Sequence, residues 1–251
     1  SLIFKAWQAS QPSPGAGKKW VRSLNIAGLL FAWFLLLAGF GAGWGCFDRG
    51  REGVHVVVFL AVTLFVPWLV LLAGLTAWFF RPAQVGLIAP LLKKLATPFA
   101  GEKGREAAAR IEGNPELAKA LGWRTAALAQ NAAMDFHLGA LLSLSTMVFF
   151  RRVGFFWETT TDTAMQKTLE TAVKLLSSPW ASFAPQFVPN VAETRRGAGW
   201  QGGGEGWIGF LLLALVVWGV APRVLLQLFA KVREWLALSS PAFQSPAHRK
   251  L

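Results

Sequence analysis

The chain has 251 residues, of which 54% are apolar and 15% charged, and it contains 13 Trp, 20 Phe, no Tyr and a single Cys, with a net charge of +12. Soluble domains carry roughly 25% charged residues on average. This composition excludes a collagen, a coiled coil, a disulfide scaffold and a disordered polymer, and it indicates a membrane protein.

Four stretches of the chain are long and apolar enough to cross a bilayer. A crossing helix needs about 18 or more apolar residues to cover a hydrocarbon core about 30 Å thick. The four stretches are residues 24–44, 54–80, 125–150 and 207–229. The sequence therefore predicts an all-α integral membrane protein with four transmembrane helices.

The distribution of basic residues predicts the orientation of these helices. Of the 25 Lys and Arg residues, 17 lie on the side of the two chain ends and of the link 81–124, and eight lie in the other two loops. Because positive charge is retained in the cytoplasm, we expect the arm 1–23, the link 81–124 and the tail 230–251 to be cytoplasmic. We therefore expect a multi-pass membrane protein with both chain ends in the cytoplasm. The net charge reflects topology and attraction to anionic lipid, with no nucleic acid as a partner.

The cytoplasmic link 81–124 is predicted to form short amphipathic helices. Asn114 and Pro115 have the pattern of a helix start, and Gly122 is expected to end that helix. Two roles are open for this link. It forms a helix pair lying near the head groups, or it is a docking surface for a soluble partner.

The periplasmic region 151–206 is expected to contain one amphipathic helix at the membrane interface, residues 162–176. Apolar residues recur there at helical spacing, and Thr163 with Gln166 resembles a capping box. Trp157 and Trp180 flank the helix. Aromatic side chains of this kind favour the head-group region, so we predict that both act as interfacial anchors.

A run of alternating glycines ends the first transmembrane stretch. Gly39, Gly41, Gly43 and Gly45 form two overlapping pairs of small residues spaced four apart. Such pairs allow two helices to approach closely in a membrane. We predict that they pack against another helix, either of the same chain or of a second copy.

Polar residues inside the third and fourth transmembrane stretches are the candidates for a function. Ionisable groups in the bilayer are costly and are therefore functional candidates. The predicted intramembrane polar cluster comprises Gln130, Asn131, Asp135, His137 and Arg223. At a rise of about 1.5 Å per residue, Arg223 lies at a membrane depth similar to that of Asn131 and Asp135. We predict that Arg223 pairs with one of them, either as a structural ion pair or as part of a proton or ion path.

The sequence offers no arrangement typical of an enzyme, a metal site or a cofactor. Three His and one Cys give no metal-ligand spacing. His55 and His137 differ in depth by about 18 Å at about 1.5 Å per residue, so they cannot hold one haem within a chain. Two copies of His137 across a dimer remain open. We therefore predict a protein that is not an enzyme and has no cofactor and no metal.

Several short elements resemble a known family. They are the run from Trp123 to Leu141 with Gln130-Asn131 and Phe136-His137-Leu138-Gly139, the run from Val153 to Thr160, and Pro179-Trp180. These elements resemble the domain of unknown function 2868 family of bacterial inner-membrane proteins. The chain departs from it at Phe155-Phe156-Trp157, where the family commonly has Phe-Gly-Trp. The family has no established activity, and its members are often encoded beside a GTPase-like protein, which implies such a partner.

Two functions are compatible with these observations. The first is a non-enzymatic, oligomeric adaptor or scaffold in the inner membrane that acts with a cytoplasmic GTPase-like partner through residues 81–123. The alternative is a small homo-oligomeric ion or proton channel or transporter that uses the polar cluster of the third span with Arg223. The two differ in whether these side chains face water or a neighbouring helix.

Overall fold

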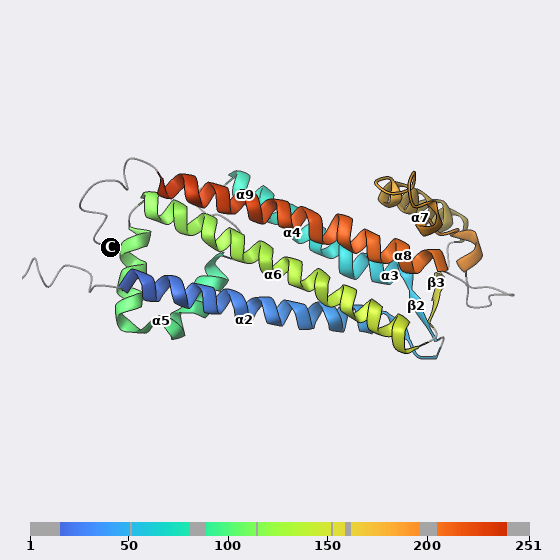
Figure 1. The fold of residues 1–251 in the computed structure, drawn as a ribbon, viewed down its shortest axis with the longest axis horizontal. Helices are drawn as coiled ribbons and strands as arrows, with labels where there is room; N and C mark the ends of the chain where they lie inside the picture. The colour runs from blue at the N-terminus through green and yellow to red at the C-terminus, as the bar shows by residue number, and fades with distance from the viewer. Residues whose placement is uncertain are drawn as a thin grey trace, which may run out of the picture. The chain divides into compact units, whose positions relative to one another are not determined.

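The computed structural model describes residues 16–50, 52–80, 89–113, 115–151, 153–158, 162–195 and 205–239. Four of the described helical stretches are long and apolar enough to cross a membrane: Gly17–Gly45, Val56–Ala77, Leu117–Phe150 and Gly206–Leu238. The predicted all-α fold with four transmembrane helices is confirmed. Figure 1 shows these helices, which are the long elements of the ribbon.

All four spans contain helix breaks or extensions that the apolar pattern did not predict. The second is built from α3 (Val56–Leu60), the π-helix η1 (Ala61–Phe65) and α4 (Val66–Phe80). The fourth is built from α8 (Glu205–Ala214), the π-helix η4 (Leu215–Val220) and α9 (Ala221–Leu238). The third, α6 (Pro115–Phe150), begins well before residue 125. The first is the unbroken helix α2 (Ala16–Gly45), which begins before the predicted residue 24.

Gly122 does not end a helix, contrary to the prediction for the link. The helix α6 continues through it, and the residues on either side are buried, including Ala120, Leu121 and Trp123. A glycine inside a helix costs only about 1 kcal/mol. Burial of the neighbouring side chains therefore outweighs its preference for a helix end.

A small three-stranded sheet, absent from the predictions, connects the ends of the helices. The strands β1 (Phe47–Asp48) and β2 (Gly53–His55) are antiparallel, and β2 pairs in parallel with β3 (Gly154–Phe156). The second span therefore begins at Val56 instead of residue 54. The side chain of His55 caps it by accepting a hydrogen bond from the Val58 N–H.

By its contacts the chain divides into two compact units, and each of the four membrane-spanning helices contributes to both. The first unit comprises residues 1–32, 72–132 and 225–251. In it, Trp20 and Leu24 of α2 pack against Ala96 and Ala100 of α5 (Ala89–Glu112) and against Leu121 of α6. These contacts fix α5 on the other helices of this unit.

The second unit comprises residues 33–71 and 133–224 and holds the larger apolar core. It includes the sheet, α7 (Asp162–Ser177) and two short 3-10 turns, η2 (Pro185–Phe187) and η3 (Ala192–Thr194). Trp157, Trp180 and Trp207 are all 1% exposed or less and lie in this core. The helix expected at residues 162–176 is thus present, and its buried residues Leu169 and Val173 pack on the same core.

Candidate functional site

Two prolines lie inside the membrane-spanning helices of the second unit, and each follows a π-helix. Pro67 is the second residue after η1, and Pro222 is the second residue after η4. Proline has no N–H, so the carbonyl four residues earlier loses its α-helical donor. The carbonyls affected are those of Thr63 and Trp218. The two π-helices pack against each other, which brings the two breaks together.

The carbonyl of Trp218 receives a hydrogen bond from another helix. The indole Nε1 of Trp68, the residue after Pro67, donates to it at 2.8 Å. The indole Nε1 of Trp218 in turn donates to the carbonyl of Leu176 at 2.8 Å, at the end of α7. Trp218, which lies in the fourth span, therefore connects the second span to α7.

His137 occupies the corresponding place at the other break. Its side chain is 1% exposed and forms a hydrogen bond with the backbone of Thr63. Its Nδ1 is buried without a hydrogen-bond partner. The ring lies against Gly219 of η4, where an added Cβ would be 2.8 Å from Nδ1. His137 is thus held between the two π-helices.

Arg223 links the two prolines directly. It is 6% exposed, and its Nη2 donates to the carbonyl of Pro67 at 2.7 Å. An unsatisfied backbone group in hydrocarbon costs several kcal/mol, so Trp68 and His137 stabilise the fold by bonding the carbonyls of Trp218 and Thr63, and Arg223 adds a bond between the second and fourth spans. We call the set Thr63, Pro67, Trp68, His137, Trp218, Pro222 and Arg223 the proline clamp.

The rest of the predicted polar cluster is only half-buried. Gln130, Asn131 and Asp135 all lie on α6 at intermediate exposure. Asn131 accepts a hydrogen bond from Gln227 of α9 at 3.0 Å, within the first unit. The pairing of Arg223 with Asp135 or Asn131 stays a prediction.

The glycines of the first span meet α6, but only at alternate positions. A Cβ on Gly39 would overlap the carbonyl of Phe136, and a Cβ on Gly139 would overlap the carbonyl of Leu36. A Cβ on Gly43 would lie 2.9 Å from Ser143 Oγ. The positions of Gly41 and Gly45 have nothing within 4 Å. The closest approach of α2 and α6 therefore depends on Gly39 and Gly139.

The anchor role predicted for Trp157 and Trp180 is wrong. Their side chains are 0% and 1% exposed, so neither can reach a head group. The indole of Trp157 donates to the carbonyl of Val191 at 2.8 Å, and that of Trp180 to the carbonyl of Phe187 at 3.3 Å. An indole N–H buried in a core needs such a partner, and here the loop after α7 supplies it.

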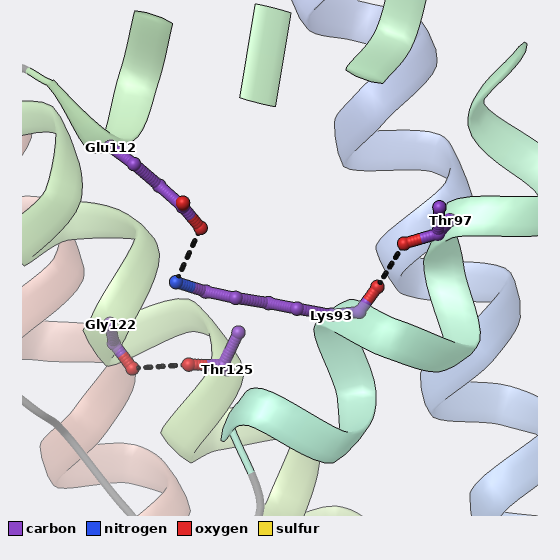
Figure 2. Close-up of polar contacts among 5 residues, drawn as sticks. All are labelled: Lys93, Thr97, Glu112, Gly122 and Thr125. Carbon is purple, nitrogen blue, oxygen red and sulfur yellow. Dashed lines mark hydrogen bonds and ion pairs between the residues drawn. The ribbon is translucent and has the colours of Figure 1, made fainter. Parts of the chain in front are cut away.

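In the first unit, polar contacts fix the shape of α5 and the start of α6. Figure 2 shows Lys93 and Glu112 pointing toward each other, with Nζ 2.8 Å from Oε1. They connect the two ends of α5, which bends at Gly101 (φ 64°). In the same view the Thr125 hydroxyl donates to the carbonyl of Gly122 at 2.8 Å.

A second ion pair joins α6 to α9 in this unit. Arg124 Nη1 lies 2.9 Å from Glu234 Oε1, and Nη2 of the same guanidinium donates to Asn25 Oδ1 at 3.0 Å. One arginine therefore bonds side chains of α2 and α9.

No group of three or more His, Cys, Asp or Glu that could hold a metal ion occurs among the described residues. The single cysteine, Cys46, is buried, and its thiol donates to the carbonyl of Ala42 at 3.2 Å. Burial raises the pKa of the Cys46 thiol to about 11. The thiol is therefore protonated and weakly nucleophilic at neutral pH.

The sequence analysis missed most residues of the proline clamp. Thr63, Trp68 and Trp218 look like ordinary members of apolar spans, and Gly139 and Gly219 were not predicted to pack against another helix. The signal in the sequence was the proline inside the second span and the one inside the fourth. Each identifies the carbonyl four residues earlier as one that needs another donor.

Fold and site together define an all-α protein with four helices able to cross a membrane and a hydrogen-bonded clamp at two proline breaks. The chain belongs to the family described as protein of unknown function (DUF2868), whose model matches residues 90–251. The resemblance identified from the sequence is confirmed. No curated protein and no solved structure matches the chain.

Proposed function

We propose that the protein is a non-enzymatic, oligomeric adaptor of the bacterial inner membrane that holds a GTPase-like partner at the cytoplasmic face. The binding surface is the exposed face of α5. The partner class comes from the family resemblance, and the cytoplasmic placement of α5 comes from the distribution of Lys and Arg.

The observation that carries this proposal is the two-faced structure of α5. Leu92, Ala96 and Ala100 point into the first unit and are 4% exposed or less. Leu91, Leu95 and Phe99, spaced four apart, are 44%, 39% and 50% exposed. A helix held rigidly from one side that presents an apolar stripe on the other is typical of a recognition surface. We call Leu91, Leu95 and Phe99 the α5 stripe.

The membrane-embedded polar residues support a scaffold. His137 and Arg223 are almost fully buried and supply hydrogen bonds to Thr63 and Pro67. These bonds strengthen the fold and leave the external face of α5 as the surface for recognition. The open positions of Gly41 and Gly45 on α2 offer a face on which a second copy can pack.

The test is purification of the full chain from its native membrane in mild detergent, with and without a non-hydrolysable GTP analogue. We expect a stoichiometric GTPase-like protein whose retention depends on the analogue. The triple variant Leu91→Ala, Leu95→Ala, Phe99→Ala should abolish its retention while leaving the amount of membrane protein unchanged.

A matched control exists on α4. Leu69, Leu72 and Leu75 lie three residues apart and are 65%, 50% and 41% exposed, but they lie in a membrane-spanning helix. Replacing all three by alanine should leave partner retention intact. The proposal would be contradicted if both triple variants lost the partner equally, or if the triple variant of the α5 stripe still retained it. In that case α5 is a helix lying on the head groups.

One observation favours the alternative, an ion or proton channel. Nδ1 of His137 is buried without a partner, as a proton-relay nitrogen could be. A homogeneous homo-oligomer that purifies without a partner would favour this alternative. Flux in liposomes that is lost on Asp135→Asn would then identify the path.

A further inference from the structure

We propose that the second unit contains a binding site for a phospholipid head group, in a cavity at the end of the first and third spans. The site is independent of the adaptor function. Its ligand is a phosphate diester whose head group also carries a hydroxyl or ammonium donor.

The cavity has a volume of about 570 Å³ and is lined by Phe47, Arg49, Glu52 and Arg151. Two arginines face one space, and guanidinium groups bind phosphate oxygens through charge-assisted, often paired hydrogen bonds. A carboxylate on the same wall disfavours a bare phosphate. It can accept a hydrogen bond from a hydroxyl or ammonium group, so it selects a head group that has one.

The position of the cavity identifies the phosphate as that of a lipid. Phe47 lies two residues after the end of α2 at Gly45, and Arg151 directly follows the end of α6 at Phe150. Both helices are membrane spans. The exposed fractions of Phe149 and Phe150 are 83% and 84%, as expected for side chains in contact with acyl chains. The two guanidinium groups thus lie where a bilayer places its phosphates.

Two aromatic rings hold Arg151, the residue after α6, in position before any ligand binds. The guanidinium carbon of Arg151 lies 5.6 Å from the ring centroid of Trp44 and 5.3 Å from that of Phe47. Both distances are within the range of cation–π attraction, which is about 6 Å. The ring of Phe47 is fixed in turn because β1 pairs with β2. The rings hold the guanidinium in place, which lowers the entropic cost of binding.

The opposite wall is also fixed by the small sheet. Glu52 has φ 48°, in the left-handed region that non-glycine residues seldom adopt. Its carbonyl accepts a hydrogen bond from the Gly154 N–H at 3.1 Å, next to the pairing of Gly53 with Gly154. Such backbone conformations concentrate at ligand sites, where the surrounding structure imposes them.

The experiment uses the purified full chain, stripped of lipid in detergent and titrated in native mass spectrometry. The probes are dioctanoyl phosphatidylethanolamine, dioctanoyl phosphatidylglycerol, dioctanoyl phosphatidic acid and inorganic phosphate. We expect the first two to bind more tightly than phosphatidic acid, whose head group is a bare phosphate monoester without an alcohol hydroxyl or an ammonium group. Arg49→Gln and Arg151→Gln should each weaken binding about fivefold, the effect of losing one basic residue near a lipid surface.

A matched control is Arg233→Gln. The guanidinium of Arg233 lies 5.4 Å from the Trp123 ring centroid, so this variant removes the same kind of stacked arginine away from the cavity. It should bind lipid like the unchanged protein. Glu52→Gln should bring phosphatidic acid close to the other two lipids.

Unchanged binding in both Arg49→Gln and Arg151→Gln would overturn the site. Arg49 lies on an exposed turn, so its variant still tests the proposal if Arg151→Gln does not fold. If inorganic phosphate binds the cavity as tightly as the lipids do, the conclusion that the phosphate belongs to a lipid is wrong. Equal binding of phosphatidic acid and phosphatidylethanolamine would overturn the role of Glu52.

Discussion

The indole Nε1 of Trp68 donates a hydrogen bond to the carbonyl of Trp218 at 2.8 Å, across two different membrane spans. That carbonyl has no α-helical donor because Pro222 lies four residues later. Near the other break, Arg223 Nη2 donates a hydrogen bond to the carbonyl of Pro67, the residue before Trp68. The residue after Pro67 thus bonds the carbonyl of Trp218, and the residue after Pro222 bonds the carbonyl of Pro67.

The Trp68 bond gives the first prediction. Trp68→Phe should lower the free energy of unfolding by about 1–3 kcal/mol, the cost of leaving a buried acceptor unsatisfied. The measurement is reversible unfolding in detergent micelles. Trp33→Phe is the control, because Trp33 is 59% exposed on the first span and its replacement should cost little.

A double-mutant cycle separates this bond from simple loss of packing. Pro222→Ala restores an N–H that can serve the Trp218 carbonyl within the helix. In that background Trp68→Phe should cost clearly less than it does alone. Equal costs in the two backgrounds would mean that the indole acts only by filling space.

The crossing of α2 and α6 gives the second prediction. Gly139→Ala should destabilise the protein by about 1–3 kcal/mol or more, because the added methyl overlaps the backbone of α2 at Leu36. Gly41→Ala, in open space on α2, should be neutral or stabilise by up to about 1 kcal/mol through helix propensity. Thermal unfolding of both variants in one detergent provides the comparison. Similar losses in the two would refute the close approach.

The two ion pairs of the first unit should differ in strength. Glu234→Gln should cost about 1–2 kcal/mol, because Glu234 is 17% exposed and its partner Arg124 also bonds Asn25. Glu112→Gln breaks the more exposed pair with Lys93 and should cost about 0.2–1 kcal/mol. Added salt should reduce the effect of Glu112→Gln more than that of Glu234→Gln. The reverse order would contradict the assigned burial.

Cys46 gives a prediction about alkaline pH. Burial raises the pKa of its thiol from 9.0 to about 11, so the folded state holds this proton more tightly than the unfolded state. The contribution to stability is complete below pH 9 and is lost as the pH rises through about 11. The difference in unfolding free energy between the unchanged protein and Cys46→Ala should therefore fall over that range. A flat difference would show that the thiol is accessible to water.

The same thiol can be tested by its reactivity. A maleimide should modify Cys46 slowly in the folded protein at pH 7, because the thiol is buried and protonated. The rate should rise sharply in denaturant. Equal rates in the two states would contradict the buried position.

The apolar pattern was sufficient to predict the helices that cross the membrane. Length and hydropathy alone decide whether a helix can span a hydrocarbon core, and both are local properties. The helix of residues 162–176 was predicted for the same reason, since its apolar spacing is local. The strand Gly53–His55 was not, because its pairing with Gly154–Phe156 joins segments about one hundred residues apart.

Aromatic residues show why local patterns were less informative about the sites. Trp157 and Trp180 flank an amphipathic helix, which is the pattern of an interfacial anchor, yet both are buried in the core. Hydropathy cannot separate a tryptophan that faces head groups from one that faces a core, because both environments favour the same amphipathic ring.

The sequence by itself determined the class of the protein, its four spans and its family, because these depend on composition, on hydropathy and on runs of neighbouring residues. Only the tertiary structure decided which helices meet at Gly39 and Gly139, and which side chains bond the carbonyls of Thr63 and Trp218, four residues before Pro67 and Pro222. A proline reveals in sequence that a carbonyl has lost its donor. The donor that replaces it comes from a distant segment, and only the folded packing brings the two together.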